Sequence, residues 1–128
     1  MEYTRVLRLN KEFRRLYYQG RYKPHPKVVT YCLKNSQNEA RIGITTGKKI
    51  GNAVTRNRAR RILSAAYRAV EKQLDLKGYD FVFVARKDII GARSTELEKI
   101  LFKQIAYLTK QKKNAGIIEN QETICEKY

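Results

Sequence analysis

The sequence has few of the residues on which metal sites and disulfide frameworks depend. It contains two cysteines and one histidine, and the two cysteines, Cys32 and Cys125, form no Cys-x-x-Cys pair. Two cysteines cannot build a disulfide framework, and without a Cys/His cluster we expect no metal cage. We predict that Cys32 is a core residue and Cys125 an incidental thiol, so no disulfide partner is expected.

Long hydrophobic runs are also absent. Residues 1–10 alternate between polar and apolar side chains and lack the apolar core of about 7–15 residues that marks a signal peptide. Nowhere do about 18 apolar residues follow one another, which is the length that a membrane-spanning helix needs. We therefore expect a soluble, cytoplasmic protein with no membrane partner.

Acidic residues are scarce, and their distribution is uneven. The chain has 12 Asp or Glu against 28 Lys or Arg, a net charge of +16. Residues 1–70 hold 17 basic and 3 acidic residues, residues 71–128 hold 11 and 9, and residues 40–70 hold no acidic residue. Such a charge is typical of a protein whose partner is negative, and phosphate is the leading candidate. The first half of the chain should carry the interaction surface.

Apolar spacing predicts a short first helix. Asn10 can cap it, and Phe13, Leu16 and Tyr17 share one of its faces. Gly20 can end the helix in a left-handed conformation. The helix is therefore predicted to be brief and to have one apolar face.

Two longer helices follow. Asn52 can cap the first of them, and Thr95 with Glu98 fits a capping box at the start of the second. Their apolar residues recur every three or four positions, so each helix should lay one stripe on a sheet. The stripes are Ala59, Ile62, Leu63, Ala66, Val70 and Leu74 in the first helix and Leu97, Ile100, Leu101, Ile105 and Leu108 in the second.

Three segments have the pattern of strands. Residues 28–33 are β-branched and apolar, and residues 41–46 alternate with a period of two. We predict that these two segments form an antiparallel pair. Residues 81–85 are apolar throughout, which is typical of a central strand.

The order of these elements, α-β-β-α-β-α, predicts the fold class. It favours an α/β (α+β) two-layer sandwich in which helices pack on a small mixed sheet. A length of 128 residues suits one compact domain, which we place at residues 1–110. The pattern fades after that point, and we predict that residues 111–128 are a disordered tail.

The helix after Asn52 has a cationic outward face. On a helical wheel, four residues point away from the apolar stripe and three flank it. Arginine can bind phosphate through two hydrogen bonds, and Asn57 can pair with a base edge or a sugar hydroxyl. The helix therefore suits folded RNA or DNA. The outward residues are Asn57, Arg61, Ser64 and Arg68, with Arg56 and Arg60 on one flank and Arg58 on the other.

A resemblance becomes specific at the start of this helix. The segment Lys48-Lys49-Ile50-Gly51-Asn52-Ala53-Val54-Thr55-Arg56-Asn57-Arg58-Ala59-Arg60-Arg61 resembles the signature of the bacterial ribonuclease P protein family, and the likeness extends over about residues 5–110. It implies a protein subunit with no catalytic residue, because the family's partner RNA cuts the 5′ leader from precursor tRNA. The ribonucleoprotein would require Mg²⁺, with no cofactor or metal held by the protein. The family fold also implies a left-handed βαβ crossover through the basic helix, against the right-handed default.

The resemblance implies that the basic segment binds the catalytic RNA. In the family the Arg-Asn-Arg helix contacts that RNA, and the matching residues would do so here. Ser64 departs from the family, which often has a basic residue at that position, while Arg68 keeps a charge one turn later. The implied contact residues are Lys48, Lys49, Asn52, Arg56, Asn57, Arg58, Arg60, Arg61 and Arg68.

Aromatic residues indicate a second surface. Phe13 and Tyr17 lie one turn apart, and Tyr31 lies on the first predicted strand. Their spacing leaves two readings open, since such residues either pack in the core or stack on unpaired bases. The family has a cleft between its first helix and the sheet that holds the single-stranded leader of precursor tRNA. The resemblance therefore implies a leader-binding cleft lined by Phe13, Tyr17, Tyr31, Thr45 and Arg86.

Two RNA surfaces on one protein imply a mechanism. Binding at one surface raises the effective concentration at the other, so the protein positions precursor tRNA on the catalytic RNA. Its fixed cations should also lower the magnesium requirement, because they reduce repulsion between phosphates.

Other functions also fit parts of the sequence. A ribosomal or DNA-packaging protein would have the same charge and the same Arg-rich helix, and a cationic face can also bind an acidic protein. A protein nuclease would need an acid, a base or a metal cage, and the one histidine, His25, lies between two prolines. Preference for one RNA would separate these alternatives.

Overall fold

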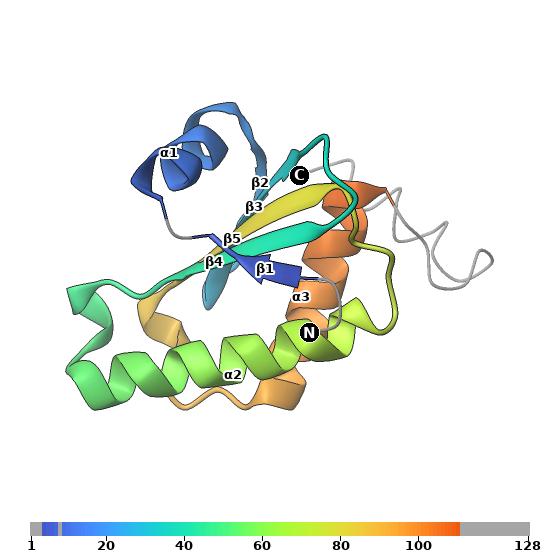
Figure 1. Cartoon of the computed structure of the whole chain (residues 1–128). Helices are drawn as coiled ribbons and strands as arrows, with labels where there is room; N and C mark the ends of the chain where they lie inside the picture. Colours follow the sequence, from blue (N-terminus) through green and yellow to red (C-terminus); the bar gives the residue numbers. More distant parts are fainter. Residues whose placement is uncertain (1–3, 8, 111–128) are drawn as a thin grey trace.

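A computed structural model describes residues 4–7 and 9–110, which form three helices and a five-stranded mixed sheet (Figure 1). The predicted tail and Cys125 lie outside the described residues. The strands are β1 (Thr4–Val6), β2 (Arg21–Lys23), β3 (Val28–Lys34), β4 (Ala40–Thr45) and β5 (Tyr79–Ala85). The helices are α1 (Asn10–Gln19), α2 (Ala53–Glu71) and α3 (Ser94–Thr109), with short 3-10 turns η1 (Lys48–Ile50) and η2 (Lys87–Ile89).

The sheet has the order β1-β4-β5-β3-β2. The predicted central strand is confirmed, because β5 pairs antiparallel with β3 and parallel with β4. The predicted pairing of residues 28–33 with 41–46 is wrong, since β5 lies between those two segments. The reason is burial: Phe81, Val82 and Phe83 are all fully buried, so β5 is apolar on both faces and takes the middle position.

Helices cover the two faces of the sheet unequally. In Figure 1, α1 lies on one face, and α2 and α3 lie together on the other. Both β4 and β5 run toward the left of that view, with β1 and β4 nearest the reader, and α2 returns beneath them. This path makes the β4–α2–β5 crossover left-handed, as the family resemblance implied.

The predicted start and apolar stripe of α2 are confirmed. Asn52 Oδ1 accepts hydrogen bonds from the backbone N–H of Thr55 at 2.9 Å and from the Thr55 hydroxyl at 3.0 Å. The stripe residues of α2 are buried or packed against the core, and Leu74 joins them from just beyond the helix end. Tyr67, which the stripe omitted, is also fully buried, and its ring lies 5.7 Å from that of Phe83.

The predicted cap of α1 is wrong by one residue, and the helix ends at Gly20 as predicted but not in the predicted conformation. Leu9 is the cap residue, and its backbone N–H donates to Glu12 Oε1 at 3.1 Å. Gly20 follows the helix in an extended conformation (φ −78°, ψ 160°) and is not left-handed. Glycine fits there for another reason, since an added Cβ would lie 2.6 Å from the carbonyl oxygen of Leu16 and 2.9 Å from that of Cys32.

The predicted capping box of α3 is also wrong. The cap residue is Arg93, so Thr95 lies inside the helix, and the Glu98 carboxylate accepts instead from Gln73 Nε2 at 3.2 Å. The apolar stripe is confirmed, because Leu97, Leu101 and Ile105 are fully buried. Hydrophobic spacing therefore located the helix correctly, although the capping pattern did not.

Cys32 is a core residue, as predicted. Only 5% of its surface is exposed, on the face of β3 that α2 and α3 cover. Burial raises the pKa of its thiol to about 12. The thiol therefore stays protonated at neutral pH and packs as a small apolar side chain.

Candidate nucleic-acid interface

The basic surface runs along α2, from the N-terminal end of the helix, at the lower left of Figure 1, to Arg68 in its last turn. Its cations make no salt bridge with any residue in the described part of the chain. Arg56 is half-buried and the other members are exposed, and from Arg56 to Arg68 the helix axis advances roughly 18 Å. We call this surface the basic face; it consists of Lys48, Lys49, Arg56, Asn57, Arg58, Arg61 and Arg68.

Two residues predicted to bind the catalytic RNA have other contacts. Asn52 is exposed, but its side-chain oxygen caps α2 and only its amide nitrogen is left for a ligand. Arg60 Nε donates to Thr46 Oγ1 at 3.0 Å, so its guanidinium is held at the end of β4. Arg60 is exposed as well, and it lies on the flank of the basic face beside Thr46.

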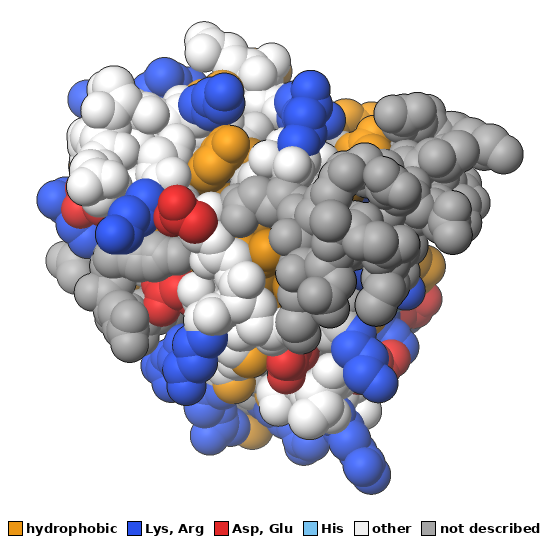
Figure 2. Space-filling model, turned by 90° about the vertical axis from the view of Figure 1, so that its right-hand side faces the viewer, with side chains coloured by type: hydrophobic (Ala, Val, Ile, Leu, Met, Phe, Trp, Pro, Cys, Tyr) orange, Lys and Arg blue, Asp and Glu red, His pale blue; other side chains and the backbone are white. Residues whose placement is uncertain are grey.

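A different face has mixed charge. Figure 2 shows the side that lies at the right in Figure 1, where Asp and Glu side chains alternate with Lys and Arg among the described residues. Away from α2, Arg5 and Glu39 form a salt bridge, with 3.3 Å between Nη1 and Oε1. The basic face differs from this side because no acidic residue occurs between residues 40 and 70.

Helix α1 packs on the other face of the sheet through a small apolar cluster. Leu7, Leu16 and Val82 are buried there, with Phe13 and Tyr31 partly buried around them. The Phe13 ring lies directly over Gly43, since a Cβ at that glycine would be 2.5 Å from two ring atoms. Phe13 therefore packs against the sheet and still leaves part of its ring exposed.

Gly43→Ala should displace Phe13 and destabilise the protein. A methyl group has no room under the ring, so we expect a loss of about 1–3 kcal/mol in the free energy of unfolding. Urea unfolding followed by circular dichroism measures it. Gly47→Ala is the matched control, because no atom lies within 4 Å of its added Cβ and its φ of −76° suits alanine. An equal loss in the two variants would contradict this packing.

Beside α1 the sheet presents a row of aromatic rings. The Tyr17 and Tyr31 rings meet edge to face at 5.0 Å, and those of Tyr31 and Tyr22 lie 5.6 Å apart. The hydroxyls of Tyr17 and Thr45 are 3.2 Å apart. We call Tyr17, Tyr22, Tyr31 and Thr45 the aromatic strip. Tyr22 was not predicted; it is 59% exposed and lies opposite Tyr31 on the edge strand β2.

Arg86 lies at the end of the same sheet, and it lines a hollow that no residue of the aromatic strip lines. Its backbone N–H donates to the carbonyl of Lys27 at 3.0 Å, and its conformation is extended (φ −109°, ψ 165°). Alternation along β5 then places it on the face of Val82 and Val84, the face that α1 covers. The hollow beside it, about 400 Å³, is shared with His25, Lys87 and Asp88. Of the five predicted leader residues, Phe13, Tyr17 and Thr45 line a second hollow of about 460 Å³ beside α1, and Tyr31 lines neither.

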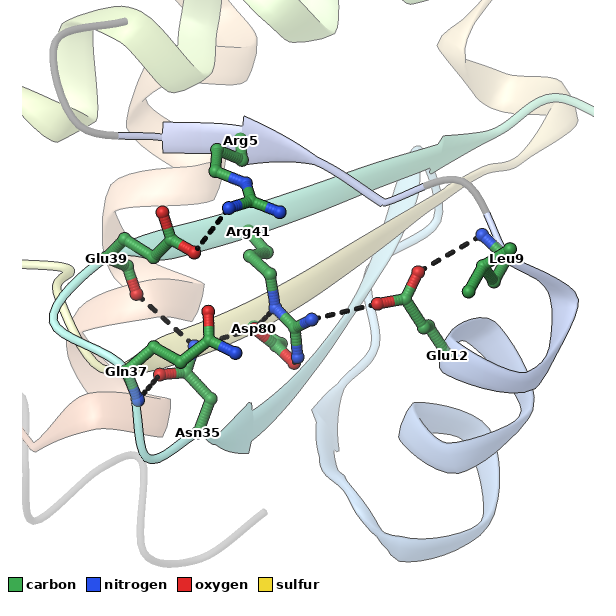
Figure 3. Close-up of polar contacts among 8 residues, drawn as sticks. All are labelled: Arg5, Leu9, Glu12, Asn35, Gln37, Glu39, Arg41 and Asp80. Atoms are coloured by element: carbon green, nitrogen blue, oxygen red, sulfur yellow. Dashed lines mark hydrogen bonds and ion pairs between the residues drawn. The ribbon is translucent and has the colours of Figure 1, made fainter.

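A buried ion-pair network holds α1 to the sheet (Figure 3). Arg41 donates to Asp80 from Nε at 2.9 Å and from Nη2 at 2.6 Å, and to Glu12 of α1 from Nη1 at 2.8 Å. Asn35 Nδ2 also donates to Asp80, at 2.7 Å. Hydrogen bonding to Asp80 raises the pKa of Arg41. Glu12 near the start of α1 and Tyr17 near its end therefore both bind the sheet, through Arg41 and Thr45.

Neither a metal-binding cluster nor a membrane-spanning helix is found among the described residues. In the parts that the structure describes, 4–7 and 9–110, no three His, Cys, Asp or Glu side chains lie close enough to hold a metal ion. Among the same residues, no helix combines the length and apolar character that crossing a bilayer requires.

The fold and these surfaces define a class: a small basic α+β protein with a cationic helix on one side of a mixed sheet and exposed aromatic rings on the other. Comparison with known proteins identifies the family within this class. A family model described as Ribonuclease P matches residues 1–109, and the chain belongs to that family. Its members are protein components of the tRNA-processing ribonucleoprotein ribonuclease P, so membership implies an RNA partner and a place in the holoenzyme.

Relatives match most of the chain. The ribonuclease P protein component of Clostridioides difficile (strain 630) is 38% identical over 96 residues, which cover 75% of this chain and 84% of that protein. The component of Clostridium beijerinckii is 33% identical over 123 residues, covering 91% and 92%.

Solved structures confirm the fold. The RNase P protein from Thermotoga maritima superposes with a TM-score of 0.69 at 23% identity and covers 84% of this chain and 97% of its own. The Staphylococcus aureus RNase P protein gives 0.67 at 23% identity, with 82% and 92% covered.

Proposed function

We propose that this protein binds the catalytic RNA of ribonuclease P through the basic face and the single-stranded 5′ leader of precursor tRNA through the surface beside α1. The observation that carries the proposal is the unpaired charge of the basic face, since residues 40–70 contain no acidic residue. Arginine forks and the Asn57 amide suit phosphates and sugar hydroxyls of folded RNA. The bacterial cytoplasm is the compartment that this function requires.

The leader surface has the chemistry that unpaired bases need. Tyr17 and Tyr22 are exposed and Tyr31 is half-exposed, and stacking on such rings contributes about 1–3 kcal/mol per base. Mature tRNA has no leader to place there. Affinity gained at this surface should therefore discriminate precursor from mature tRNA.

In this proposal the protein supplies no reacting group, and the RNA cleaves the leader. The protein binds both RNAs at once, so each contact raises the effective concentration of the other. Its cations replace part of the screening that Mg²⁺ otherwise provides between phosphates. Both effects act by positioning the substrate.

Reconstitution tests the proposal. The protein is mixed with a bacterial ribonuclease P RNA, and cleavage of 5′-labelled precursor tRNA is followed across a magnesium titration, with protein-only and RNA-only controls. We expect cleavage at low magnesium only with both components. Tight RNA binding without stimulation of cleavage would instead favour a general RNA-binding protein.

Phe13→Ala should weaken binding of precursor tRNA about tenfold and leave binding of mature tRNA unchanged, because it removes part of the stacking surface.

A further inference from the structure

An apolar groove lies between the start of α2 and the chain that connects β5 to α3, which passes along the N-terminal half of α2 (Figure 1). The groove measures about 200 Å³. Pockets that hold whole ligands commonly measure about 300–1,000 Å³, so this one has room for a single flat ring and not for a complete nucleotide. Its apolar walls are Ile50, Val54 and Ile62 on one side and Ile89 and Ile90 on the other.

Two of these side chains are exposed on opposite sides of the groove. Val54, in the first turn of α2, is 74% exposed, and Ile90 is 53% exposed. Single exposed apolar residues are common on protein surfaces, but two that flank one hollow form a continuous apolar surface. The groove therefore offers a place where a partner can bury apolar area.

A type II turn holds Ile90 at the edge of the groove. Ile90 has φ −60° and ψ 126°, Gly91 has φ 85°, and the N–H of Ala92 donates to the carbonyl of Ile89 at 3.0 Å. This turn requires a positive φ at its third residue, which glycine adopts without strain. Ile89 is fully buried and anchors the turn in the core. Local backbone geometry therefore keeps Ile90 exposed in a defined position.

The edge of the groove on the α2 side is cationic. Arg58 lines the groove one turn after Val54, no carboxylate lines it, and Arg58 forms no salt bridge within the described part of the chain. Arg58 also belongs to the basic face, so the groove opens beside the surface assigned to the catalytic RNA. A nucleobase has two apolar faces and a hydrogen-bonding edge, which match apolar walls and a guanidinium beside them. RNA-binding proteins commonly hold bases that have left their stack in this way.

We propose that this groove binds one unpaired base of the catalytic RNA, with the base between Val54 and Ile90 and its edge or phosphate at Arg58. The proposal rests on the proposed function, which supplies the RNA partner. It adds an apolar contact to a surface whose other contacts are charged. Phosphate contacts are the same on every RNA, whereas the groove accepts only a base that is unpaired at the right distance from the basic face. The groove therefore gives the protein a preference for one RNA.

A double variant, Val54→Ala with Ile90→Ala, tests the groove by titration of labelled catalytic RNA at several salt concentrations. We expect about a tenfold loss of affinity, because apolar area is no longer buried. The slope of log K against log salt should stay unchanged, since no phosphate contact is lost. Val6→Ala is the matched control, because Val6 is a valine on β1 that is 60% exposed and does not line the groove. Its affinity should stay within about twofold of the wild type, and all variants should unfold at the same urea concentration.

Chemical probing identifies the base. At saturating protein, the catalytic RNA is treated with dimethyl sulfate and with a carbodiimide, which modify the edges of unpaired bases. The wild type and Val6→Ala should protect one unpaired base that the double variant leaves reactive. The bases and phosphates along the basic face should be protected equally by all three proteins, because Arg58 and its neighbours are unchanged.

Three results would overturn the groove as a base site. One is a double variant that binds the catalytic RNA within about twofold of the wild type while Arg58→Glu weakens binding; the proposed function then stands and the groove alone is rejected. Another is a loss of affinity with the same protected bases as the wild type. The third is a dimer of the free protein, measured by sedimentation, that the double variant abolishes, since a second copy would then occupy the groove. A wild type that binds catalytic RNA no better than an unrelated folded RNA rejects the proposed function together with the groove.

Discussion

Arg58→Glu should weaken binding of the catalytic RNA roughly 30-fold, or about 2 kcal/mol, at moderate salt. Arg58 is exposed on the basic face and forms no salt bridge with a described residue, so the change removes a phosphate contact and adds a repelling charge. The measurement is a titration of labelled RNA at several salt concentrations. The slope of log K against log salt should also fall by about 1, because fewer counterions are released.

Lys103→Glu is the matched control for this variant. Lys103 is exposed on α3, outside the basic face, and its replacement changes the net charge by the same amount. Its affinity should stay within about threefold of the wild type, because distant exposed charges are screened. Equal losses in the two variants would mean that total charge, and not the basic face, determines RNA binding.

Asp80→Ala should cost about 3–5 kcal/mol of folding free energy, the largest stability loss that we expect from a single substitution in this chain. The Asp80 side chain is 3% exposed and accepts two hydrogen bonds from Arg41 and one from Asn35. Without it, a guanidinium that is only 15% exposed keeps Glu12 as its one carboxylate. Urea unfolding, with folding of the variant checked by circular dichroism, measures the loss.

Arg5→Ala is the comparison for the buried network. Arg5 also forms a salt bridge, to Glu39, but its side chain is 70% exposed, so its loss should cost less than about 1 kcal/mol. Asp80→Asn should fall between the two, since it keeps the shape and loses the charge. A loss at Asp80 no larger than that at Arg5 would show that the network does not stabilise the fold.

The sequence predicted the helices well because burial imposes a period on them. The apolar stripe of α2 and its Asn52 cap can be read directly, since the residues that determine them lie within one or two turns. Strand partners cannot be read in this way. A period of two reports which residues share a face and not which strand lies alongside, so β3 and β4 were paired although β5 separates them. The three-residue strands β1 and β2 are too short to show a period at all.

The same difference between local and distant contacts explains which parts of the candidate site could be predicted from the sequence. The basic face could be predicted because its cations lie between residues 48 and 68, on η1 and α2, with no acidic residue among them. The Arg41 network was not, since its partners Asp80 and Glu12 are 39 and 29 residues away in the sequence. The hydrogen bond from Arg60 to Thr46 likewise depends on how the end of β4 packs beside α2, which helical spacing does not report.

The crossover through α2 has a consequence for the kinetics of assembly. Because α2 joins the two neighbouring strands β4 and β5 and buries Leu63, Ala66 and Tyr67 against them, it cannot shift without disturbing the centre of the sheet. For the proposed RNA partner the basic face is therefore already formed before the encounter. We expect an association rate that is set by electrostatic steering and falls steeply with ionic strength, with no slow ordering step.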